Sequence, residues 1–132
     1  LGTFKPIEKE DIRDHKMHNE YFSISSNSLR KLQSFKRSQK PVICLGTTSV
    51  RALETLAQNN FEKNSGWTDL FIYPPYKFRM VQGLFTNFHL PKSTLLIMVS
   101  AFYGREKILE AYQIAIGEEY RFYSYGDCML IL

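Results

Sequence analysis

The run "PVICLG", residues 41–46, limits the possible folds of this chain more than any other stretch. Residues 42–45 are all apolar, so the strand that they predict has two apolar faces and belongs in the interior of a parallel sheet. The run that follows, "TTSVRALETLAQ", places Val50, Leu53 and either Leu56 or Ala57 on one face of a helix. A covered strand that leads directly into an amphipathic helix indicates an α/β fold.

The segment before this strand continues the alternation of strands and helices. Residues 21–25, "YFSIS", alternate between apolar and polar side chains and predict a strand. Ser25 or Ser26 then caps a helix, and Pro41 ends it. The apolar positions of this helix are Leu29, Leu32 and Phe35.

The second half of the chain predicts two more strands, two helices and a final strand region. "TDLFIY" (68–73) is a strand that the following proline pair ends, and "RMVQGLFTN" (79–87) is another. A helix with Ser93 as N-cap runs to about residue 103 and is apolar nearly all round, so it needs cover on most sides. Residues 105–116 form the next helix, and 120–132 hold one or two strands. The inward face of the 105–116 helix carries Ile108, Leu109, Tyr112 and either Ala115 or Ile116.

A strand and a helix that both need full cover indicate three layers. The chain has 132 residues, which is enough for one domain with a hydrophobic core. Its first residues, "LGTFKP", have the pattern of a strand that is already under way. We therefore expect residues 1–132 to form an incomplete part of a longer α/β domain, which would self-associate through its uncovered surfaces.

The chain is basic, with a net charge of +4 and a pI near 9.1. Much of the excess lies in residues 30–40, "RKLQSFKRSQK", a pattern that suits a polyanion such as nucleic acid, although a solvated helix face is the alternative. No apolar run approaches the roughly 18 residues that span a bilayer, so we expect no membrane partner. Cys44 and Cys128 are predicted as buried free thiols, which suits a reducing cytoplasm.

The turn "CLGTTSVR" is the first candidate binding site. Gly46 allows a ligand to approach the backbone, and free N–H groups at a helix start favour a phosphate, a carboxylate or a polar ring edge. Thr47 and Thr48 add hydroxyls, and Arg51 is a possible anion clamp. Strand–Gly–Thr turns are common, so a purely structural turn is the alternative.

The stretch "TNFHLPKSTLL", residues 86–96, is the second candidate. A proline turn with Ser93 as helix cap explains part of it, but not why Asn87, His89 and Lys92 gather where a strand meets a helix. Histidine is the side chain best suited to proton transfer near neutral pH, so His89 is the first candidate for acid–base chemistry.

Two smaller groups complete the candidate residues. His15, His18 and Glu20 suit a hydrogen-bonding or general-base role, and the absence of a CxxC or HExxH partner argues against a metal site. In "SYGDC", Asp127 follows a glycine, lies near two tyrosines that include Tyr125, and precedes an apolar strand. A turn aspartate that caps its own backbone is the simplest account of it.

Taken in order, these stretches resemble the S-adenosylmethionine:tRNA ribosyltransferase-isomerases of queuosine biosynthesis. The matching runs are "LGTFKP", "EDIRDHKMHNEYF", "GTTSVRALE", "TDLFIYPPYKF", "GLFTNFHLPKSTLLIMVSAFYGRE" and "YRFYSYGDCMLIL". The resemblance implies the C-terminal part of the family's α/β catalytic domain, with a three-layer sandwich-like architecture. It also implies that the N-terminal strands and an inserted β-barrel domain lie outside this chain.

The resemblance also implies a reaction. Such enzymes transfer the ribosyl group of S-adenosylmethionine to 7-aminomethyl-7-deazaguanine at the wobble position of tRNA. They rearrange this group to give epoxyqueuosine, with release of adenine and methionine. The expected cosubstrate is S-adenosylmethionine without a metal, the expected partner is tRNA that carries a 7-deazaguanine wobble base, and the expected location is the cytoplasm.

Residue roles follow from the same resemblance. His89 is the leading candidate for the base that removes a proton next to the sulfonium, with His15, His18 and Glu20 behind it. The Gly46–Thr48 turn would hold ribose hydroxyls or the methionine carboxylate, with Arg51 as counter-charge. Predicted binding residues elsewhere are Asn87, Lys92, Ser93, Tyr125 and Asp127. The alternatives are an inactive fragment, a tRNA-binding module without catalysis, and, more weakly, a generic nucleotide-binding domain.

Overall fold

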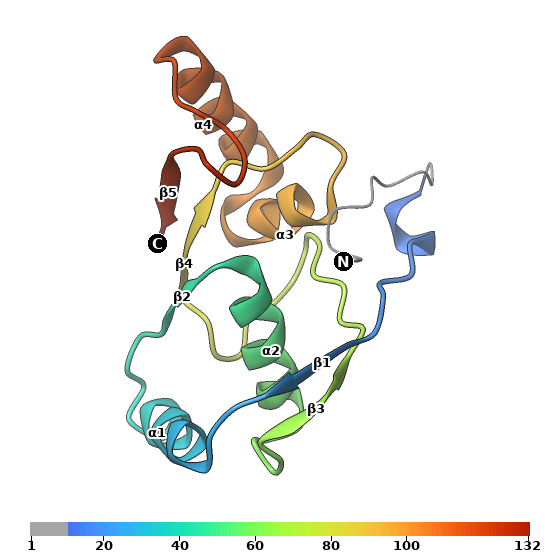
Figure 1. Ribbon diagram of the computed structural model, residues 1–132, viewed down its shortest axis with the longest axis vertical. Coiled ribbons are helices and arrows are strands. Elements are labelled where there is room, and N and C mark those ends of the chain that lie inside the picture. Colours follow the sequence, from blue (N-terminus) through green and yellow to red (C-terminus); the bar gives the residue numbers. More distant parts are fainter. Residues whose placement is uncertain (1–10) are drawn as a thin grey trace.

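The computed structural model describes residues 11–132 and has an α/β fold (Figure 1), which confirms the predicted fold class. Three strands form one sheet in the order β2 (Ile43–Leu45), β4 (Gly83–Asn87), β5 (Cys128–Ile131). β2 is parallel to β4, and β5 is antiparallel to β4. A separate antiparallel ribbon pairs β1 (Glu20–Ser23) with β3 (Ser65–Thr68).

Helix α2 (Thr47–Gln58) joins the two sheets. It begins directly after β2 and contacts β2, β4 and β3, so it lies between the three-stranded sheet and the ribbon (Figure 1). Its inward face carries Val50 and Leu56, as predicted, but also Arg51 and Glu54, which are almost completely buried. Burial of two charged residues on one helix face requires partners for both.

Of the other helices, α1 and α4 lie at opposite ends of the molecule, and α3 lies between them (Figure 1). Helix α1 (Ser26–Arg37) begins after Ser25, whose hydroxyl accepts from the backbone N–H of Ser28, so the predicted cap is confirmed. Helices α3 (Thr94–Tyr103) and α4 (Arg105–Gly117) pack on one another. Gly104, with a φ of +90°, forms the corner between them.

The three-stranded sheet buries only one of its faces in the described part of the chain. The row Cys44, Leu84, Ile131 is buried, whereas the adjacent row Leu45, Phe85, Leu130 is 74%, 40% and 53% exposed. The prediction that β2 is covered on both faces is therefore wrong for residues 11–132. Helix α2 covers one side of β2, and β4 is the one strand that pairs with it there.

Two other predictions need correction, and one pair of alternatives is resolved. The strand predicted at 68–73 instead spans Ser65–Thr68, and the segment that follows is irregular because Arg51, rather than a neighbouring strand, binds its carbonyl at Leu70. Cys128 is an exposed free thiol rather than a buried one, since it starts β5 at the rim of the sheet. Ile116 is 56% exposed, so Ala115 fills the inward position on α4.

The run "LGTFKP" lies outside the described residues. Within residues 11–132, no helix is both long enough and apolar enough to span a membrane.

Candidate active site

A hollow of about 350 Å³ lies where the two parallel strands end. β2 and β4 are neighbours and run in the same direction, so the turns that follow them lie side by side at the carboxyl edge of the sheet. The β2–α2 turn supplies Gly46, Thr47 and Thr48, and the β4–α3 turn supplies residues 86–90 with Ser93 and Leu95. Tyr123 and Ser124 close it from the loop before β5. We call this space the active-site hollow.

Gly46 shapes the first wall of the hollow. Its φ of +82° is one that residues with a Cβ rarely adopt, so the sequence needs glycine here. Its N–H donates to the carbonyl of Phe85 at 2.9 Å, which ties the turn to β4. No side chain caps the start of α2, so the N–H groups of its first turn remain available beside Thr47 and Thr48.

The start of α3 forms the second wall. The Ser93 hydroxyl accepts from the N–H of Leu96 at 3.1 Å and donates to the carbonyl of Leu90 at 2.7 Å. Its proton is therefore committed to the turn, and a ligand would find only an acceptor position on this oxygen. Two helix N-termini, those of α2 and α3, border the same hollow and favour an anionic group in it.

His89 is held at both its backbone and its ring. The backbone N–H donates to the Tyr112 hydroxyl at 2.9 Å, and Nε2 lies 2.9 Å from the Thr86 hydroxyl oxygen. Burial lowers the pKa of His89 to about 4, so the imidazole is neutral near pH 7. A neutral ring has one nitrogen that accepts a hydrogen bond or a proton, but the cationic form is disfavoured at this position.

Asn87 connects β4 to the loop before β5. Its side-chain nitrogen donates to the carbonyls of Gly126 and Asp127, each at 3.3 Å. Asp127 accepts from the backbone N–H of Arg121 at 2.8 Å and forms an ion pair with the Arg121 guanidinium. A Cβ at position 126 would lie 2.2 Å from the Arg121 carbonyl oxygen, so glycine is required there as well. The turn-capping alternative thus describes the contacts of Asp127.

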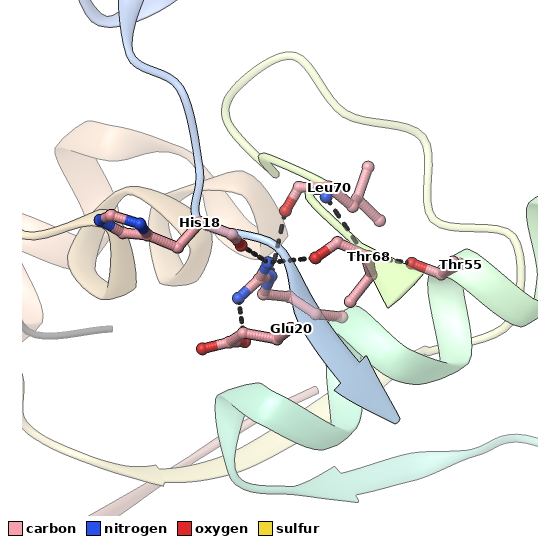
Figure 2. Close-up of polar contacts among 6 residues, drawn as sticks. His18, Glu20, Thr55, Thr68 and Leu70 are labelled. Atoms are coloured by element: carbon pink, nitrogen blue, oxygen red, sulfur yellow. Dashed lines mark hydrogen bonds and ion pairs between the residues drawn. The ribbon is translucent and has the colours of Figure 1, made fainter. Parts of the chain in front are cut away.

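Arg51 lies in a different cluster, where α2 meets the β1–β3 ribbon. Figure 2 shows its acceptors His18, Glu20, Thr68 and Leu70. Its guanidinium forms an ion pair with Glu20 and donates to three backbone carbonyls. These acceptors are Leu70 at 3.1 Å, Thr68 at 3.3 Å and His18 at 3.4 Å. The Thr55 and Thr68 hydroxyls, 2.7 Å apart, add a bond beside it. With a side chain only 2% exposed, Arg51 fastens α2 to the ribbon.

The structure brings together six of the predicted site residues and separates the others. Those that line the active-site hollow are Gly46, Thr47, Thr48, Asn87, His89 and Ser93. Those that lie outside its lining are His15, His18, Glu20, Arg51, Lys92, Tyr125 and Asp127. The ring of His15 packs 5.3 Å from that of Phe71, Lys92 is exposed, and Tyr125 is 98% exposed. The catalytic and binding roles assigned to all these residues stay predictions.

Sequence reasoning missed six lining residues and one buried anchor. The lining residues are Thr86, Phe88, Leu90, Leu95, Tyr123 and Ser124. The anchor is Glu54, whose carboxylate accepts from the backbone N–H groups of residues 79–81 at 2.8 to 3.0 Å and from the Tyr76 hydroxyl at 3.2 Å. This carboxylate fixes the segment that leads into β4, and its position on the inward face of α2 was the one signal that could have revealed it.

The described residues include no group of three His, Cys, Asp or Glu side chains placed to hold a metal ion.

Comparisons with known proteins point to one family. The family model described as "Queuosine biosynthesis protein" matches residues 1–131. A protein of Sulfurihydrogenibium sp. (strain YO3AOP1), named S-adenosylmethionine:tRNA ribosyltransferase-isomerase, is 57% identical over 132 residues, which are 100% of this chain and 39% of that relative. A protein of the same name from Halothermothrix orenii is 52% identical over 134 residues, again 100% of this chain and 39% of the relative.

A solved structure is also similar. The crystal structure of the S-adenosylmethionine tRNA ribosyltransferase from Thermotoga maritima superposes with a TM-score of 0.78 at 46% identity. The superposition covers 85% of this chain and 40% of that one. The chain therefore spans about two fifths of the length of the relatives that it matches. Because a family model matches almost every residue and relatives are more than half identical, the chain belongs to the queuosine biosynthesis protein family.

Proposed function

We propose that this chain supplies the C-terminal part of the catalytic α/β domain of an S-adenosylmethionine:tRNA ribosyltransferase-isomerase. The reaction is transfer of the ribosyl group of S-adenosylmethionine to 7-aminomethyl-7-deazaguanine in tRNA. Isomerisation of this group gives epoxyqueuosine, and adenine and methionine leave. The location that follows from a tRNA substrate is the cytoplasm. The observation that carries the proposal is the match along the whole chain to relatives of that name.

The active-site hollow supports this proposal through its donors. S-adenosylmethionine carries a carboxylate, ribose hydroxyls and an adenine ring. Backbone N–H groups at the starts of α2 and α3 suit the carboxylate, and the hydroxyls of Thr47 and Thr48 suit the ribose. The resemblance suggested Asn87, Lys92 and Ser93 for the adenine edge or a phosphate, and of these Asn87 and Ser93 line the hollow.

We assign His89 to proton transfer at the carbon next to the sulfonium. The ring is neutral near pH 7 because burial lowers its pKa to about 4, so a lone pair is present on the base form. The Thr86 hydroxyl contacts the ring at Nε2, and the Tyr112 hydroxyl fixes the backbone of His89 by accepting from its N–H. A pKa this far below neutrality makes the base weak, and a bound carboxylate near the ring would raise it.

The test is adenine release by a chimera in which this chain replaces the matching stretch of the Sulfurihydrogenibium relative. We expect the chimera to release adenine from S-adenosylmethionine when precursor-bearing tRNA is present. His89→Ala should lower turnover by roughly 10²-fold or more with little change in tRNA affinity. Gln113→Ala, on the exposed face of α4, is the matched control. Full turnover by the His89→Ala chimera would remove His89 from the mechanism, and tRNA binding without any adenine release would favour a binding module.

A further inference from the structure

A second hollow, of about 510 Å³, lies between the end of α2 and strand β3. Its lining comes from residues 55–67 together with Phe22, and none of these residues lines the active-site hollow. We call it the α2–β3 hollow. Neither the proposed reaction nor the residues assigned to it gives this space a role.

One wall of the α2–β3 hollow is an exposed aromatic ring. Trp67 is 65% exposed, and Tyr21, its register partner across the ribbon, is 59% exposed. The two ring centroids lie 5.5 Å apart, edge to face, so each ring limits the movement of the other. A large exposed indole that is held in place by a neighbour offers a flat surface on which another ring can stack.

The rest of the lining is mainly polar. Gln58, Asn59 and Asn60 present exposed carboxamides at the end of α2, and Lys63 presents an ammonium group. Carboxamides pair with the donor and acceptor pattern on the edge of a nucleobase, and ammonium groups contact phosphate. The lining also contains Glu62, and a carboxylate is a suitable acceptor for the exocyclic amino group of a base. Such a lining does not suit an apolar peptide.

Positive charge continues beyond the hollow. Lys36 on α1 lies with its ammonium nitrogen 5.1 Å from the centre of the ring of Phe61, whose neighbours in the chain, Asn60 and Glu62, line the hollow. Other exposed cations on the same helix are Arg30, Lys31 and Arg37. A polyanion that reaches Trp67 would therefore meet cations on the adjoining surface.

We infer that the α2–β3 hollow binds an unpaired nucleobase of RNA, stacked on Trp67, with its edge facing Gln58, Asn59 and Asn60 and its phosphate near Lys63. The inference rests on the proposed function, because it names a surface through which a tRNA substrate would be held. Unpaired bases are required, since a base within a duplex has neighbours on both faces and offers none to a side chain.

The test uses the only tryptophan of the chain, Trp67, as its own probe. The 132-residue chain is titrated with an RNA hairpin whose unpaired loop has about seven nucleotides, as in an anticodon arm. In a separate titration the ligand is a fully paired RNA duplex with the same number of nucleotides as the hairpin. We expect saturable quenching of Trp67 emission by the hairpin and little by the duplex. Anisotropy of labelled hairpin gives the affinity of each variant.

Trp67→Ala should weaken hairpin binding about tenfold or more, and Trp67→Phe much less, since phenylalanine keeps a stacking face. Lys63→Glu gives a second variant that leaves the aromatic pair intact and should also weaken binding. Tyr103→Ala, at an exposed aromatic on α3, is the matched control and should bind as the parent chain does. Circular dichroism checks that each variant is folded.

Two results would overturn the inference. Hairpin binding without quenching, and with equal affinity for parent and Trp67→Ala, would place the RNA elsewhere on the chain. Quenching by hairpin and duplex alike would show contact without base stacking. Neither result bears on the proposed reaction, because adenine release by the chimera is measured independently of Trp67.

Discussion

The buried imidazole of His89 makes the stability of this chain depend on pH in a way that one substitution isolates. Burial lowers the pKa of His89 from 6.5 to about 4 in the folded state, whereas the unfolded chain exposes the ring to water. Above pH 6.5 the ring is neutral in both states and contributes no pH dependence. Between 6.5 and about 4 only the unfolded state gains the proton, so the free energy of unfolding falls as the pH falls.

The size of this effect follows from the two pKa values. Each unit of difference corresponds to about 1.36 kcal/mol, so lowering the pH from 7 to 5 should remove about 2 kcal/mol of stability through His89. That figure is an upper value, because the ring is only partly buried and water screens the part that remains exposed. The substitution His89→Gln keeps a side-chain amide that can bond to Thr86, but it does not titrate.

The assay is urea unfolding of the parent chain and of His89→Gln at pH 7 and pH 5. The difference at pH 7 gives the cost of the substitution itself, and the change in that difference at pH 5 gives the contribution of the titration. We expect the free energy of unfolding of the parent chain, relative to that of His89→Gln, to fall by up to about 2 kcal/mol between pH 7 and pH 5. An equal change in the free energy of unfolding of the two proteins between pH 7 and pH 5 would refute the idea that His89 is held neutral by burial.

Three further predictions concern other parts of the chain. Replacing Arg30 and Arg37 with glutamate should weaken tRNA binding and reduce the slope of log affinity against log salt concentration by about one for each phosphate that the helix no longer neutralises. An unchanged slope in a salt titration would show that α1 is only a solvated face. Glu54→Gln should destabilise the chain by about 3 kcal/mol in urea unfolding, because three backbone N–H groups, two of them buried, lose a charged acceptor. Exposed Glu110→Gln is the control, and equal stability of the two variants would contradict this. The chain alone should self-associate in sedimentation through its exposed sheet face, and Leu45→Glu should reduce this; a monomeric parent chain would contradict it.

The order of strands and helices could largely be predicted from the sequence, because each element carries a local signal. Ser25 and Ser93 are both helix caps in the structure, as their positions before apolar periodic runs predicted. The strand at 43–45 and the helix after it also lie where the apolar pattern placed them. Such signals depend on neighbours within a few residues, so they survive without knowledge of the tertiary structure.

Predictions failed where distant contacts decide the outcome. The apolar residues 68–73 resemble a strand, but buried Arg51 takes up the carbonyl of Leu70 in the place of a neighbouring strand. The burial of Arg51 was not predicted for the same reason, because its partners in the structure, Glu20 and three carbonyls, are remote in sequence. No local pattern marks such a partner.

The two main turns of the candidate site could be predicted from the sequence, but the residues that complete its lining could not. "CLGTTS" and "TNFH" each had an unusual polar composition at a strand end, and parallel pairing of β2 and β4 brings them together. Thr86, the ring partner of His89, lay within the second motif but carried no signal of its own, and Tyr123 and Ser124 enter through a loop that Asn87 and Gly126 fix.

The most direct test of the proposed reaction follows the ribose carbons. S-adenosylmethionine labelled with ¹³C throughout the ribose is incubated with precursor-bearing tRNA and the chimera that contains this chain, and the wobble nucleoside is analysed by mass spectrometry. The proposal predicts that all five labelled carbons of the ribose enter the tRNA and that His89→Ala nearly abolishes this transfer. Modified tRNA that lacks the ribose label would contradict a ribosyl transfer. So would a second experiment in which S-adenosylmethionine labelled only at the methyl carbon passes its label to the tRNA while the ribose-labelled form does not.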